Sequence, residues 1–75
     1  MNTETKNISF KPRELKVIQL LAEGYSSREI AEKLKFSFYT IKQDIHNIIY
    51  KSNAKNRINA IYKLVYNGYV KPPTT

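Results

Sequence analysis

Apolar residues recur at helical spacing along nearly the whole chain, and few residues interrupt that pattern. The two glycines are Gly24 and Gly68, and the three prolines are Pro12, Pro72 and Pro73. Between them the apolar positions return every three or four residues, as on one face of an α-helix, and not every second residue as in a half-buried strand. We therefore expect an all-α fold.

The length of the chain limits it to one small domain. Its 75 residues are about half of the ~150 that an average domain occupies, so a deep substrate pocket is not expected. The packed domain should span residues 10–70. Residues 1–9 lack an apolar pattern and Pro72 and Pro73 cannot continue a helix, so we expect a flexible N-terminal segment and a flexible C-terminal tail over 71–75.

Start and stop signals divide this domain into four helices. Pro12 suits the first position of a helix, and Gly24 can end it with a left-handed backbone. Ser26 and Glu29 form a capping box, in which each side chain satisfies a free amide of the other residue. The remaining signals are two helix caps and a stop: Ser37, Asn56 and Gly68.

Each predicted helix carries an apolar stripe that should face the core. The stripes are Leu15, Ile18, Leu21 and Ala22, then Ile30, Ala31 and Leu34, then Ile41, Ile45, Ile48 and Ser52, and finally Ala60, Ile61, Leu64 and Val65. Ser52 is the weak, polar member of this set. Only three or four residues around 35–37 separate the second and third helices, which is the connection length of a helix-turn-helix. We expect a four-helix helix-turn-helix domain.

The charge of the chain is strongly basic and lies in its second half. The formal net charge is +7, and residues 33–75 hold eight of the 13 basic residues and one of the six acidic ones. The entire excess therefore lies in the second half of the chain. Such a domain favours nucleic acid or an anionic membrane surface as its partner.

The outer face of the third helix carries side chains that suit DNA. Opposite its buried stripe lie Tyr39, Lys42, Gln43, His46 and Tyr50. Lys and His can donate to guanine or to phosphate, Gln can pair with adenine N6 and N7, and a helix fits the major groove. We expect Lys42, Gln43 and His46 to read base edges of double-stranded DNA.

A set of residues between about 10 and 70 follows the order and spacing of a known family. These residues are Pro12, Arg13, Glu14, Val17, Ile18, Leu20, Leu21, Ala22, Glu23, Gly24, Ser27, Glu29, Ile30, Ala31, Leu34, Ser37, Thr40, Ile41, Lys42, Ile45, Asn47, Ile48, Lys51, Lys55, Asn56, Arg57 and Ala60. In them the chain resembles the LuxR/GerE-type helix-turn-helix family of bacterial transcription factors. The resemblance implies that the third helix, about 38–52, enters the major groove. It also implies a homodimer formed through the fourth helix.

Further contact residues follow from this resemblance. Backbone phosphates are expected at Ser37, Tyr39, Thr40, Tyr50, Lys51, Lys55 and Arg57. The dimer interface is expected at Ile61, Tyr62, Val65 and Tyr66, although Tyr62, Tyr66 and Tyr69 could equally pack under the first helix. Glu14 resembles the family's structural glutamate, expected to bond into the interior or to a base such as Arg57. Asp44 flanks the core, where we expect an ion pair with a nearby Lys or Arg.

Several functions are disfavoured by residue types and spacing. The chain has no cysteine, so it forms neither a disulfide framework nor a thiolate metal site, and a reducing, cytoplasmic and nucleoid-associated setting fits best. Asp44 and His46, the only histidine, are two residues apart and do not face each other on a helix. We therefore expect no metal, no cofactor and no enzyme activity.

Two other functional interpretations remain beside that of a dimeric transcription regulator. One is a domain similar to the promoter-reading domain of a sigma factor, which the predicted cap at residues 55–57 and the helix after it argue against. The other is a basic amphipathic protein on an anionic membrane surface, although the polar outer face of the third helix disfavours it. RNA polymerase is a further candidate partner.

The short segment before Pro12 predicts a stand-alone regulator without a receiver or sensor, unless the chain is a fragment.

Overall fold

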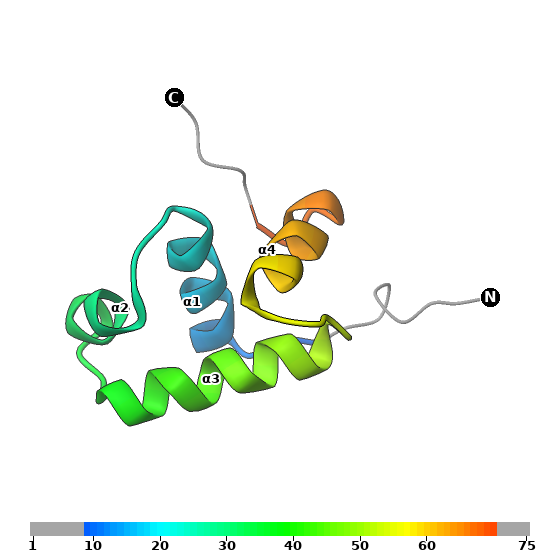
Figure 1. The fold of residues 1–75 in the computed structure, drawn as a ribbon. Coiled ribbons are helices and arrows are strands. Elements are labelled where there is room, and N and C mark those ends of the chain that lie inside the picture. The colour runs from blue at the N-terminus through cyan, green and yellow to red at the C-terminus, as the bar shows by residue number, and fades with distance from the viewer. Residues whose placement is uncertain (1–8, 71–75) are drawn as a thin grey trace.

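The computed structural model describes residues 9–70, which form four helices (Figure 1). These are α1 (Pro12–Ala22), α2 (Ser27–Leu34), α3 (Phe38–Lys51) and α4 (Arg57–Tyr66). Within this described part there is no strand, and the predicted all-α class is confirmed. The predicted flexible ends at 1–9 and 71–75 lie outside the described residues, apart from Ser9.

The helices begin where the capping residues predict. Ser26 and Glu29 form the expected capping box, with the Glu29 amide donating to Ser26 Oγ at 3.2 Å and the Ser26 amide donating to Glu29 Oε1 at 2.8 Å. Asn56 caps α4 by accepting from the Asn59 amide at 2.9 Å. Gly24 follows α1 with φ +99°, a conformation that favours glycine.

A turn of three residues joins α2 to α3. Lys35 ends α2 in the left-handed region at φ 64°, which reverses the chain within one residue. Phe36 follows, and Ser37 then caps α3 by accepting from the Thr40 amide at 3.0 Å. The predicted helix-turn-helix connection is confirmed, and α2 packs against the amino-terminal part of α3 (Figure 1).

All four helices contribute to one core. Its buried members are Val17, Ile18, Leu21, Ile30, Ala31, Ile41, Ile45, Ile48, Leu64 and Val70. Ser52, the polar member of the α3 stripe, is fully buried, and its hydroxyl donates to the Ile49 carbonyl at 3.1 Å. This bond removes the cost of burying an unpaired hydroxyl.

One member of the buried stripe expected on α1 was wrong: Ile18 and Leu21 are buried, but Leu15 is not. Leu15 is 41% exposed, whereas Glu14 and Val17 are buried beside Ile18. Positions 14, 17, 18 and 21 share one face of a helix, and residue 15 lies about 100° away from residue 14. The buried face of α1 therefore includes the carboxylate of Glu14, whereas the apolar pattern had assigned Leu15 to that face.

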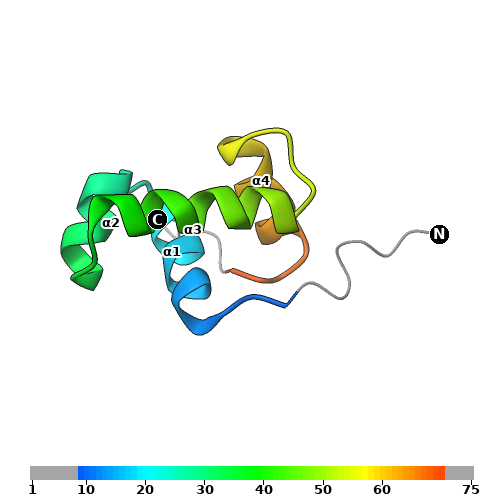
Figure 2. The same cartoon turned by 90° about the horizontal axis from the view of Figure 1, so that it is seen from below.

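The domain leaves the outer side of α3 open. In Figure 1, α3 runs along one side of the molecule, with α1 and α4 on its inner side and α2 near its amino end. In the view from below, α3 lies across the front of the domain with no other helix covering it (Figure 2). Along residues 9–70 no helix is long and apolar enough to cross a membrane.

Candidate nucleic-acid interface

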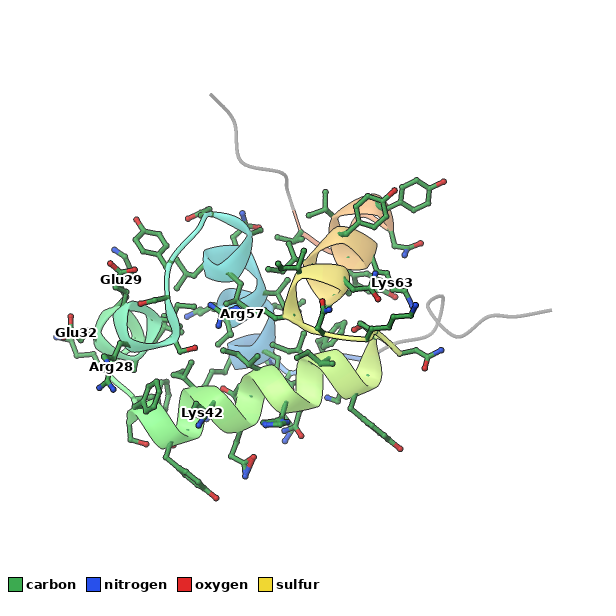
Figure 3. The ribbon with its side chains drawn as sticks, viewed as in Figure 1. Arg28, Glu29, Glu32, Lys42, Arg57 and Lys63 are labelled. Atoms are coloured by element: carbon green, nitrogen blue, oxygen red, sulfur yellow. The ribbon has the colours of Figure 1, made fainter. Side chains whose placement is uncertain are left out.

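The outer face of α3 is exposed at each position that helical geometry assigned to it. Those positions are Tyr39, Lys42, Gln43, His46 and Tyr50. Tyr39 is 70% exposed and Tyr50 is 86% exposed. Lys42 projects from the exposed surface of α3 in Figure 3. A molecule that approaches this side of the domain meets these side chains first.

Two of these side chains contact each other on the surface of α3. Gln43 Nε2 donates a hydrogen bond to the hydroxyl oxygen of Tyr39 at 3.2 Å, one helical turn away. The carbonyl oxygen of Gln43 and its second amide hydrogen stay available for a partner. Gln43 therefore keeps both an acceptor and a donor, which a bidentate contact to adenine requires.

The amino end of α3 presents hydroxyl groups beside free helix amides. Ser37 Oγ accepts from the Thr40 amide and donates to Thr40 Oγ1 at 2.9 Å. The first amides of a helix and the positive end of its dipole attract anions. This end of α3 suits the phosphate contacts expected at Ser37 and Thr40.

A bidentate ion pair ties α3 to α1. Arg13 Nε lies 2.7 Å from Asp44 Oδ2, and Arg13 Nη2 lies 2.9 Å from Asp44 Oδ1. The prediction that Asp44 pairs with a nearby base is confirmed. The hydrogen bond to Asp44 raises the pKa of the Arg13 guanidinium above its ordinary value, so Arg13 stays charged. Asp44 is thereby buried on the inner side of α3, away from the exposed face.

A second ion pair ties the carboxyl end of α3 to α1. Lys51 Nζ lies 2.7 Å from Glu14 Oε1 and 3.3 Å from the Ser9 carbonyl oxygen. Glu14 Oε1 also accepts from the Lys11 amide at 2.9 Å, so Glu14 stabilises the start of α1 as well. The expectation that Glu14 bonds to a basic residue is confirmed, although that residue is Lys51 and not Arg57, the example named above.

Arg57 connects α4 to the start of α2 instead. Its guanidinium donates to Ser27 Oγ at 3.3 Å and to the Tyr25 carbonyl at 3.5 Å, and Figure 3 shows it between these two helices. Lys51 and Arg57 thus both have hydrogen-bond partners inside the domain. Their contacts with phosphate stay predictions.

An exposed apolar ridge runs along α4. Ile58, Tyr62 and Tyr66 are 78%, 66% and 79% exposed, and the rings of Tyr62 and Tyr66 stack with centroids 6.2 Å apart. Ile61 and Val65 are partly buried against the core. Of the predicted interface, the two tyrosines therefore face outward and the two aliphatic residues face inward.

Tyr69, the third tyrosine of this region, is partly buried against the core. Tyr69 packs edge-on against Phe10, with ring centroids 5.6 Å apart. Ile58 was missed by the sequence reasoning, although it precedes Tyr62 and Tyr66 by one and two helical turns and could have been found from that spacing. The ridge of Ile58, Tyr62 and Tyr66 is named the α4 ridge below.

Between Ser9 and Val70, no group of three His, Cys, Asp or Glu side chains is placed to hold a metal ion.

Comparison with known protein families decides the classification. A family model described as bacterial regulatory proteins, luxR family, matches residues 8–64. The chain belongs to the luxR family. The match covers α1, α2 and α3 and most of α4. This is a family of helix-turn-helix regulatory proteins and not a family of enzymes.

Curated luxR-family relatives are longer than this chain. A protein named transcriptional regulatory protein DegU from Brevibacillus brevis is 42% identical over 59 residues, which cover 79% of this chain and 25% of the relative. A protein named uncharacterized transcriptional regulatory protein YxjL from Bacillus subtilis is 42% identical over 62 residues, covering 83% and 28% respectively. The chain thus spans between a quarter and a third of the length of these relatives.

Solved structures match the luxR-family fold as well. The structure of the transcription factor GerE has a TM-score of 0.79 and 34% identity, and the match covers 83% of this chain and 92% of that one. A structure of a Vibrio cholerae VqmA dimer has a TM-score of 0.82 at 23% identity, over 89% of this chain and 31% of that one. The second likeness concerns the fold alone.

Proposed function

We propose that this luxR-family domain binds double-stranded DNA with α3 in the major groove and thereby regulates transcription. The observation that carries the proposal is the outer face of α3, which is exposed along its length and carries Lys42, Gln43 and His46. A helix fits the major groove, and these side chain types can pair with base edges. Lys42, Gln43 and His46 are the proposed base-reading residues.

The proposed phosphate contacts surround this face. Ser37 and Thr40 lie at the amino end of α3, and Tyr39 and Tyr50 extend from its exposed surface. Lys55 is exposed in the loop that precedes α4. Lys51 and Arg57 complete the proposed set, and they must share their donors with partners inside the domain. Such contacts position the domain on the duplex without carrying sequence information.

We also propose that two copies bind together through the α4 ridge. Three large apolar side chains in a row on one helix are costly to leave in water, and aromatic residues are enriched at protein interfaces. A second copy would cover the ridge with its own α4 ridge, because two-fold symmetry places the same surface of both copies in the interface.

The salt dependence of binding tests the DNA proposal. We expect the protein to bind a random DNA duplex at low salt and to lose affinity steeply as salt rises, because neutralised phosphates release counterions. A protein with several phosphate contacts loses about 10³ to 10⁵ in affinity between 50 and 200 mM salt. Fluorescence anisotropy with a labelled duplex measures this slope.

Anionic lipid vesicles provide the comparison. The hypothesis that the protein binds an anionic membrane surface requires tighter binding to phosphatidylserine vesicles than to the duplex at the same salt concentration. That result, or a DNA affinity that is flat across the salt range, would contradict the proposed function.

A further inference from the structure

Two cations from different helices lie over one aromatic ring. Arg28 Cζ, from α2, lies 4.5 Å from the centroid of the Phe38 ring. Lys42 Nζ, from α3, lies 5.5 Å from the same centroid. All three residues are exposed. The ring of Phe38, the first residue of α3, thus brings a cation of α2 beside a proposed base-reading residue.

Arg28 has no carboxylate partner within the described part of the chain. The ion pairs of residues 9–70 are Arg13 with Asp44 and Lys51 with Glu14. Glu29, the next residue along α2, bonds to the Ser26 amide instead. Figure 3 shows Arg28 on the side of α2 nearest the start of α3 and Glu29 on the opposite side.

The stacked position leaves the donors of Arg28 free for a ligand. A guanidinium is planar and packs on an aromatic ring with its face, while its five N–H groups point outward from its edge. That edge matches the oxygens of a phosphate in a bidentate contact. Because the ring already restricts the side chain, less conformational entropy is lost when the contact forms.

The surroundings of Arg28 indicate which anion it meets. Ser37 and Thr40 lie at the amino end of α3 and flank Phe38, the residue that Arg28 packs on, in the sequence. In the proposed function, the DNA backbone passes this end of α3 when α3 enters the major groove.

We propose that Arg28 contacts a phosphate of the DNA backbone and that Phe38 positions its guanidinium for that contact. The inference rests on the proposed function, and it adds a residue of α2 to an interface so far assigned to α3 and the segment after it. Phe38 is a positioning residue, because it acts on DNA through Arg28.

Lys33 offers a matched control on the same helix. It is exposed, and its Nζ also lies over an aromatic ring, 4.7 Å from the centroid of Tyr25. Residues 28 and 33 lie about 140° apart around a helix, so they face different directions. Lys33→Gln and Arg28→Gln each remove one positive charge from α2, but from different sides of the helix.

The test compares the salt dependence of DNA affinity for these variants. We expect Arg28→Gln to reduce the slope of log affinity against log salt by about one unit for each bound subunit. Lys33→Gln should leave that slope unchanged. If both variants keep the steep slope of the unmodified protein, Arg28 touches no phosphate and the inference is wrong while the proposed function stands. A flat slope in the unmodified protein would overturn the proposed function itself.

Phe38 is tested by a double-variant comparison with Arg28. Phe38→Leu removes the ring and should weaken binding several-fold in the unmodified background. In the Arg28→Gln background the same change should weaken binding less, because the contact it supports is already lost. Phe38→Tyr keeps the ring and should restore the affinity. If Phe38→Leu has the same effect in both backgrounds, Phe38 does not position Arg28.

Discussion

Lys51→Met is expected to lower the free energy of unfolding by about 2 to 3 kcal/mol. This loss is smaller than that of breaking a fully buried ion pair, because water reaches the Lys51 side chain. Glu14 is 1% exposed, and its charge is compensated by Lys51 at 2.7 Å. Without the ammonium, that charge is left with the Lys11 amide as its remaining hydrogen-bond partner. The melting temperature should fall by about 10 to 20 °C, measured by circular dichroism.

Two further variants make this stability prediction specific. Lys16→Met removes an equal charge from an exposed position of α1 and should change the free energy of unfolding by less than about 0.5 kcal/mol. Adding Glu14→Gln to Lys51→Met should recover much of the loss, because the neutral amide can still accept from the Lys11 amide. If Lys51→Met and Lys16→Met behave alike, Glu14 does not hold the Lys51 ammonium.

Tyr62→Glu is expected to reduce affinity for a two-fold DNA site by about 10²-fold or more while leaving affinity for a half-site nearly unchanged. A charge placed in the centre of the α4 ridge would be buried without a partner if two copies met there. Two linked half-site contacts gain about 10²- to 10⁴-fold from acting together, and this gain is lost when the dimer separates. Anisotropy with full-site and half-site duplexes measures both affinities.

The half-site duplex is the internal control for the dimer prediction. A general repulsion between the new carboxylate and DNA would weaken binding to both duplexes equally. Tyr62→Phe keeps the ring that stacks on Tyr66 and should retain full-site binding. Equal losses of Tyr62→Glu on the full site and the half-site would argue against a dimer through the α4 ridge.

The boundaries of the fold were predictable because their causes are local. A cap such as Ser37 bonds to an amide three residues away, and Gly24 reverses the backbone by its own conformation. The error at Leu15 has a cause that is not local. Glu14 is buried because Lys51 pairs with it from 37 positions further along the chain, and an apolar pattern within one helix contains no sign of that partner.

The candidate interface also has one part that could be predicted from the sequence and another that could not. The exposed face of α3 follows from its buried stripe, since opposite faces of one helix are fixed by 100° per residue. The contact between Arg28 and Phe38 joins two helices across a turn, so it depends on how those helices pack. The pairing of Arg13 with Asp44 is similar: the sequence indicated that Asp44 needs a base, but only the packing of α1 on α3 selects Arg13.

The most direct test of the central claim, that α3 reads bases, is selection from random DNA duplexes with the unmodified protein and with Gln43→Ala. The unmodified protein should enrich a two-fold site with half-sites about one helical turn apart. Gln43→Ala should lose the preference at one position of each half-site, where a bidentate pair is worth about 1 to 3 kcal/mol of discrimination. Its affinity for random duplexes and its salt slope should stay the same. If Gln43→Ala instead enriches the same sequence as the unmodified protein, or weakens specific and random duplexes equally, the outer face of α3 does not read bases at Gln43.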